Sequence, residues 1–97
     1  GPVWIGGSHG EPTLLGNCYW NSLRLAVDNG LKSVAFPAIS TGVYRFPREL
    51  AAEVSSRTVK EFLGMEAKIE RVVFVFFSED DARVFLAHQV FDQLAKQ

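Results

Sequence analysis

The sequence has a single cysteine, Cys18, among its 97 residues. One cysteine excludes a disulfide framework within the chain and is typical of a protein from a reducing compartment. Long apolar runs are also missing, because the longest, residues 72–77, falls far short of the roughly 20 residues that cross a bilayer. No charged segment followed by an apolar one stands at the N-terminus. We therefore expect no signal peptide, no membrane partner and a cytoplasmic location.

The sequence has no excess of basic residues, with 10 Lys and Arg against 11 Asp and Glu. Without such an excess, sequence-independent binding to a nucleic-acid backbone is not expected. Metal-ligating residues are equally sparse, since His9 and His88 lie far apart and only Cys18 could join them. This spacing matches no metal site, and we expect neither a metal nor another cofactor.

The composition, 47% hydrophobic and 22% charged, indicates one globular domain over residues 1–97. Apolar residues that recur every three or four positions predict helices, and short runs rich in Val and Phe predict strands. The expected order is a strand end at 3–5, a helix over 13–28, a strand over 33–39, a helix from Pro47 to about Leu63, a strand over 71–77, and a helix that follows Ser78 and reaches Leu94.

Both complete strands lack polar alternation, which predicts that each is buried on both faces, as in a parallel sheet covered by helices. Right-handed crossovers would make all the strands parallel, so the expected class is α/β. Two strands and a strand end form a narrow sheet for three amphipathic helices, so the chain looks like half of a larger domain. The inner face of the second helix is expected to hold Leu50, Ala51, Val54, Thr58, Phe62 and Leu63.

Several candidate reactive residues have simpler structural explanations. Cys18 falls on the apolar face of the first helix, which favours a buried, inert thiol over a nucleophile. Asp80 and Asp81 could form an acid/base pair, but negative charges at a helix start explain them more simply. His9 lies in a glycine-rich loop and His88 on the last helix, and both are expected to be exposed.

The segment from Phe36 to Tyr44, Phe-Pro-Ala-Ile-Ser-Thr-Gly-Val-Tyr, follows a buried parallel strand and leads into a helix. Ligands of open α/β sheets bind at this end of the strands. Short hydroxyl residues and a glycine allow successive backbone N–H groups to surround an anion, and the helix start adds a favourable field. The alternative is an ordinary turn rich in Ser, Thr and Gly.

The segment Ala35–Tyr44, followed by Pro47, resembles the diphosphate-binding loop of macrodomains, the modules that bind ADP-ribose. The similarity extends over essentially all 97 residues, including Gly1-Pro2-Val3-Trp4 and Cys18-Tyr19. It implies a macrodomain-like parallel or mixed sheet with flanking helices, of which residues 1–97 would supply the last three strand–helix units. The amino-terminal half of the family pattern, with its Asn-rich and triple-glycine segments, has no counterpart in this sequence.

The resemblance implies that Ser40, Thr41, Gly42, Val43 and Tyr44 line the diphosphate and distal ribose of ADP-ribose. It also implies that Phe77 packs against adenine, although Phe74, Phe76 and Phe77 could all be core residues instead. No catalytic residue is assigned, because the groups responsible for hydrolysis in the family lie largely in the other half.

The function implied by the resemblance is binding of ADP-ribose, free or attached to a protein. The family includes hydrolases that remove ADP-ribose from proteins or deacetylate O-acetyl-ADP-ribose, and such activity would require the other half. Two alternatives remain: a non-catalytic reader of ADP-ribose, and a fragment that acts only as a structural or oligomerising unit. A second copy or a separate amino-terminal fragment would complete the sheet, so we expect that the chain alone is not a monodisperse monomer.

Overall fold

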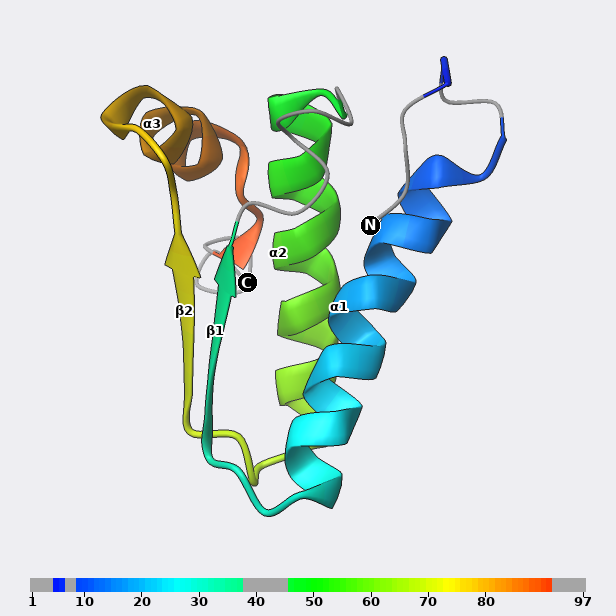
Figure 1. Ribbon diagram of the computed structural model, residues 1–97, viewed down its shortest axis with the longest axis vertical. Helices are drawn as coiled ribbons and strands as arrows, with labels where there is room; N and C mark the ends of the chain where they lie inside the picture. The colour runs from blue at the N-terminus through cyan, green and yellow to red at the C-terminus, as the bar shows by residue number, and fades with distance from the viewer. Residues whose placement is uncertain (1–4, 7–8, 38–45, 92–97) are drawn as a thin grey trace.

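A computed structural model describes residues 5–6, 9–37 and 46–91. Five elements follow one another in these ranges: α1 (Glu11–Asp28), β1 (Ser33–Pro37), α2 (Arg48–Met65), β2 (Arg71–Val75) and α3 (Glu79–His88). Figure 1 shows the two strands side by side, with α1 and α2 next to them and α3 beyond the end of β2. Within the described ranges the chain is an α/β unit, as the sequence predicts.

The two strands are parallel neighbours, paired from Ser33 with Arg71 to Pro37 with Val75. The connection between them is α2, the crossover helix that a parallel pair requires. The expected strand at residues 3–5 is wrong for Ile5, which lies in a bend. The Ile5 amide donates to the Glu11 carboxylate at 2.8 Å. This hydrogen bond connects Ile5 to the first residue of α1, and the Ile5 amide therefore does not pair with a neighbouring strand. Residues 3 and 4 lie outside the described ranges.

The helices that surround the sheet pack against one of its faces. Phe36 of β1 and Phe74 of β2 point toward this face, where the Tyr19 ring of α1 lies 4.7 Å and 6.3 Å from them. Phe85 of α3 lies 4.8 Å from Phe74 on the same side. The opposite face carries exposed residues, including Val75 with 53% of its surface accessible. The prediction that both strands are buried on both faces is therefore wrong for the described residues.

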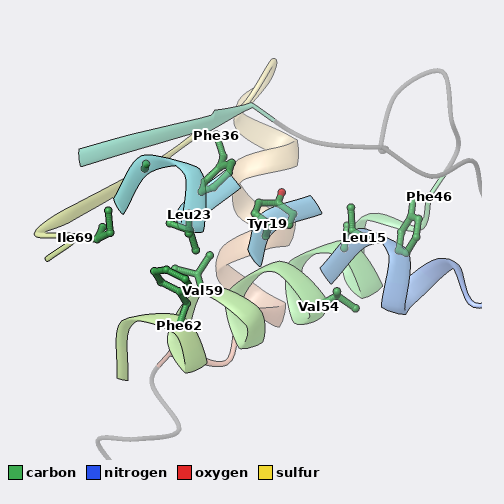
Figure 2. Packing of buried hydrophobic residues seen from close by; sticks show 11 residues of the cluster. Leu15, Tyr19, Leu23, Phe36, Phe46, Val54, Val59, Phe62 and Ile69 are labelled. Atoms are coloured by element: carbon green, nitrogen blue, oxygen red, sulfur yellow. The ribbon is translucent and has the colours of Figure 1, made fainter. Parts of the chain in front are cut away.

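The main core lies between α1 and α2 and under β1 (Figure 2). Leu15 and Leu23 of α1 and Val59 of α2 are completely buried. Gly16 allows the two helices to approach closely, since a Cβ at this position would lie 3.1 Å from Thr58 Oγ1. Trp20 adds an edge-to-face contact with Phe62, with ring centroids 5.0 Å apart.

Three inner-face predictions need correction. Leu63 is partly exposed, whereas Val59, which the pattern did not mark, is fully buried. Cys18 is only half-buried, because it lies beside the line of α1 residues that meets the core. Leu63 of α2 and Cys18 of α1 thus lie outside the buried cluster, whereas Val59 and Phe62 belong to it.

The observed bounds of α1, α2 and β2 differ by a few residues from those predicted from the sequence. α1 begins at Glu11 with Pro12 in its first turn, and it ends before Asn29 and Gly30, where Gly30 has a positive φ of 72°. Pro47 precedes α2, which continues past Gly64 to Met65. β2 ends at Val75, two residues earlier than expected.

The last helix is shorter than the sequence pattern predicts. Ser78 caps α3 by accepting a hydrogen bond from the Asp81 amide, as expected, but the helix ends at His88. Gln89 is extended, and the Val90 amide then donates to Ser56 Oγ of α2 at 2.9 Å. Val90 and Phe91 reach the core because the chain turns inward after α3, and Leu94 lies outside the described ranges.

Among the helices of the described ranges, none combines the length and the apolar character that crossing a membrane requires.

Candidate functional site

The candidate site lies at the edge where both parallel strands end. β1 ends at Pro37 and β2 at Val75, and the chain continues from this edge into the first turns of α2 and α3. Figure 1 shows the starts of α2 and α3 at the same end of the molecule, above the strand tips. Carboxyl ends of parallel strands followed by helix starts are the usual location of ligand sites in α/β proteins.

The residues predicted to hold the diphosphate, Ser40, Thr41, Gly42, Val43 and Tyr44, lie outside the described ranges. The structure fixes both sides of this segment. On one side Phe36 and Pro37 end β1, and on the other Phe46 is buried in the core before α2 begins. Of the described neighbours of this segment, Phe36 and Phe46 are buried and Pro37 is exposed.

Phe77, the predicted adenine contact, lies two residues after β2, and 85% of its surface is exposed. Phe74 and Phe76 instead pack on Phe85 of α3, with ring centroids 4.8 Å and 5.2 Å away. The alternative in which all three phenylalanines are core residues is thus wrong for Phe77. Its ring is accessible to a ligand, and contact with adenine stays a prediction.

A small cavity of about 30 Å³ lies beneath this edge. Aromatic rings form its floor, and Arg48, Ser55 and Asp81 supply polar groups. The cavity has room for about one water molecule, so it is far too small for a nucleotide.

Charge at the edge is organised around Arg48, the first residue of α2. Its Nη1 donates to Asp80 Oδ2 at 2.8 Å and to Asp81 Oδ1 at 2.9 Å. Hydrogen bonds from the Arg48 guanidinium, together with its positive charge, lower the pKa of Asp80 below its ordinary value. The same contacts raise the pKa of Arg48, so the group stays charged. Asp80 and Asp81 therefore act at the helix start, as predicted, and they also pair with another helix.

Sequence patterns did not reveal two further organising residues. Glu11 is almost completely buried, and its carboxylate accepts hydrogen bonds from the amides of Ile5 and His9 at 2.8 Å and 2.7 Å. Ser56 joins α2 to Val90. The position of Glu11 beside a proline at a helix start could have indicated its role, whereas nothing in the sequence around Ser56 indicates a contact with Val90.

The two histidines are exposed, as predicted. His9 Nδ1 lies 3.1 Å from the backbone oxygen of Ile5, and His88 ends α3. Over the part of the chain that the structure describes, no three His, Cys, Asp or Glu side chains are grouped to hold a metal ion.

Comparison with known sequences gives a consistent set of relatives. The family model described as Macro domain matches residues 1–55. A Macro domain-containing protein of Chlorobaculum tepidum is 51% identical over 85 residues, which are 88% of this chain and 49% of that protein. An O-acetyl-ADP-ribose deacetylase of Citrobacter koseri is 53% identical over 85 residues, again 88% of this chain and 48% of the relative. The chain thus spans about half the length of these proteins.

The solved structures that this chain resembles are also macrodomains. The Oceanobacillus iheyensis macrodomain with ADP superimposes with a TM-score of 0.89 at 35% identity, covering 100% of this chain and 50% of that structure. The Trypanosoma brucei macrodomain in complex with ADP-ribose superimposes with a TM-score of 0.74 at 33% identity, over 76% of this chain and 32% of that structure.

Proposed function

Because the chain belongs to the Macro domain family, we propose that it supplies one wall of an ADP-ribose site at the carboxyl edge of its sheet. In this proposal, Ser40–Tyr44 holds the diphosphate and Phe77 packs against adenine. The observation that supports it best is the exposed Phe77 ring, which stands at the same edge as the strand end that leads into Ser40–Tyr44. Relatives described with ADP and with ADP-ribose support the same ligand class.

The chemistry of the proposed contacts fits the two ends of the ligand. Short side chains at Ser40, Thr41 and Gly42 leave backbone N–H groups free to approach the diphosphate oxygens, and the start of α2 adds positive potential. An exposed aromatic ring offers a planar apolar surface for a base, whereas a buried one would not.

For the activity, we propose hydrolysis of an ADP-ribose derivative once the rest of the domain is present. Relatives described as O-acetyl-ADP-ribose deacetylases support this reaction class, and the chain by itself is expected to be inactive. Its residues would position the diphosphate and distal ribose while water attacks. The alternative is a reader that binds ADP-ribose without turnover.

The uncovered face of the sheet is the proposed contact for the remaining half of a macrodomain. Val75 and Phe77 are exposed on or next to this face, although residues of this type are usually buried in parallel sheets. The Oceanobacillus iheyensis macrodomain is about twice as long as the region that this chain matches, and its remaining half is a candidate to cover this face of the sheet.

Calorimetric titration tests the proposal. ADP-ribose is titrated into the chain alone and into the chain mixed with the part of the Citrobacter koseri relative that it does not match, with ADP and ribose as comparison ligands. We expect selective binding of ADP-ribose by the mixture, and light scattering should show that the chain alone is not a stable monomer. Release of acetate from O-acetyl-ADP-ribose then separates a hydrolase from a reader.

Phe77→Ala gives the sharpest variant, because its exposed ring can be removed without opening the core. Loss of stacking is expected to weaken ADP-ribose binding by about tenfold. Met65→Ala is the matched control, since Met65 is 76% exposed at the opposite end of α2. Absence of ADP-ribose binding by a folded mixture, or equal affinities of Phe77→Ala and the unaltered chain, would contradict the proposed site.

A further inference from the structure

The ion pair between Arg48 and the acidic start of α3 joins the two helix starts that flank the candidate site. Arg48 is the first residue of α2, and its partners Asp80 and Asp81 lie 32 and 33 positions later. One guanidinium nitrogen contacts both carboxylates. The contact therefore connects the helix that follows β1 with the helix that follows β2.

Within the described residues, α3 contacts the rest of the chain mainly through partly buried side chains. No residue of α3 is fully buried, and Phe85 provides its ring contacts with the sheet. The chain just beyond α3 is fixed to α2 by Ser56 Oγ and Lys60 Nζ, which contact the backbone of Val90 at 2.9 Å and 3.2 Å. The far end of α3 is thus tied to α2 by hydrogen bonds, and Arg48 ties the near end.

The charges at the near end give Arg48 a second effect. Glu79, Asp80 and Asp81 occupy the first turn of α3, where negative charge is favourable for the helix. The same carboxylates would repel an anionic ligand bound at this edge. The single positive charge of Arg48 offsets about half of the combined negative charge of Asp80 and Asp81.

We infer that Arg48 is a positioning residue of the ADP-ribose site, because its bridge to Asp80 and Asp81 sets the spacing between the start of α2 and Phe77, which lies two residues before α3. The inference rests on the proposed function for its ligand. It does not make Arg48 a ligand contact, because its guanidinium is already directed at the two carboxylates.

This role predicts a particular pattern of effects. Exposed ion pairs contribute little to stability, so loss of Arg48 should barely lower the melting temperature. A ligand that touches both helix starts, however, depends on their spacing, and small displacements of a site are costly for such a ligand. ADP-ribose spans both regions, whereas adenosine or inorganic diphosphate touches one of them.

The first experiment needs no ligand. Spin labels are placed at the exposed positions Glu49 and Glu79 in a Cys18→Ala background, and the distance between them is measured by pulsed electron paramagnetic resonance. Arg48→Ala is expected to broaden the distance distribution. Arg57→Ala is the matched control, because Arg57 pairs with Glu53 within α2 and is similarly exposed, so the distribution should stay narrow. An unchanged distribution in Arg48→Ala overturns the inference.

The second experiment measures affinity with the mixture described under the proposed function. Arg48→Ala should weaken ADP-ribose binding by roughly tenfold, while adenosine and inorganic diphosphate keep their affinities. Arg48→Lys should restore part of the loss, and Arg57→Ala should cause none. An equal loss for inorganic diphosphate would mean that Arg48 acts through charge alone, and the inference would then be wrong. If the unaltered mixture binds no ADP-ribose, the proposed function fails, and the distance measurement alone decides whether Arg48 sets the spacing.

Discussion

The two interfaces of α2 are built in different ways. Toward α1, the contact is mainly apolar, with Leu15, Leu23 and Val59 completely buried and Gly16 allowing a close approach. Toward α3, no residue of α3 itself is fully buried, and an ion pair and hydrogen bonds join the described elements instead. α2 is therefore a helix with one core side and one polar-linked side.

Because of this difference, the α1 side of α2 should determine the stability of the unit, and the α3 side should determine the position of α3 at the candidate site. Burial of apolar surface is the dominant favourable term in folding, so the α1–α2 contact should hold the unit together. The links to α3 are exposed or directional, and they specify where α3 lies more than whether the chain folds. α3 begins two residues after Phe77, so the placement of this helix bears on the candidate site.

The largest effect that would test this comparison is expected at Leu23. Leu23→Ala leaves a cavity in the α1–α2 core and should lower the free energy of unfolding by about 2–5 kcal/mol. Chemical denaturation of the unaltered chain and of Leu23→Ala measures this difference in the free energy of unfolding.

Leu86→Ala is the matched control for this substitution. Leu86 lies on α3 with 69% of its surface exposed, so the same chemical change should alter stability by less than about 0.5 kcal/mol. Similar losses from both variants would show that α3 is as much a part of the core as α1, and the comparison would not hold.

A smaller effect is expected at Ser56, on the polar-linked side of α2. Ser56 is fully buried, and its hydroxyl accepts a hydrogen bond from the Val90 amide. Ser56→Ala leaves this amide without its partner and should cost about 1–3 kcal/mol in unfolding free energy. Hydrogen exchange at the Val90 amide should accelerate in the same variant.

The neighbouring Ser55 provides a close control. It is also buried, but among the described residues its hydroxyl donates to the Ala52 carbonyl of its own helix, at 3.4 Å, and not to the chain after α3. Ser55→Ala should therefore change stability less than Ser56→Ala and leave exchange at Val90 unaltered. The reverse order would mean that the bond to Val90 does not secure the chain after α3.

The elements of the fold could be predicted from the sequence because their burial is periodic. Apolar spacing marked α1 and α2, and the runs rich in Val and Phe marked both strands. The same reasoning failed for Leu63 and Val59, since the exact facing of a helix depends on its neighbour and not on its own sequence. It also failed after His88, where Val90 and Phe91 continue the apolar period but are buried by a turn of the chain.

The sequence predicted a candidate site at the carboxyl ends of the strands, and the contacts of Ser40–Tyr44 and Phe77 with a ligand stay predictions. An exposed aromatic residue after a run of core phenylalanines could not be distinguished by sequence, because Phe74, Phe76 and Phe77 are chemically identical. Arg48 gave no signal either, since its partners lie more than 30 positions away. Long-range polar pairs depend on the assembled fold, which a local pattern does not contain.

The smallest effect that tests the comparison is the acid response of the link between α2 and α3. Arg48 lowers the pKa of Asp80 below its ordinary value of 3.8 through hydrogen bonding and charge. A carboxylate with a lowered pKa stabilises the folded state above its unfolded-state pKa, and this contribution is lost as the pH falls through the folded-state value. The difference in melting temperature between the unaltered chain and Asp80→Asn should therefore be constant from about pH 7 to pH 5 and shrink below about pH 4. High salt should reduce the same difference at neutral pH, because the pair is exposed. A difference that instead persists at low pH and high salt would mean that Asp80 acts through packing, and the α3 side of α2 would then resemble the α1 side more than its contacts indicate.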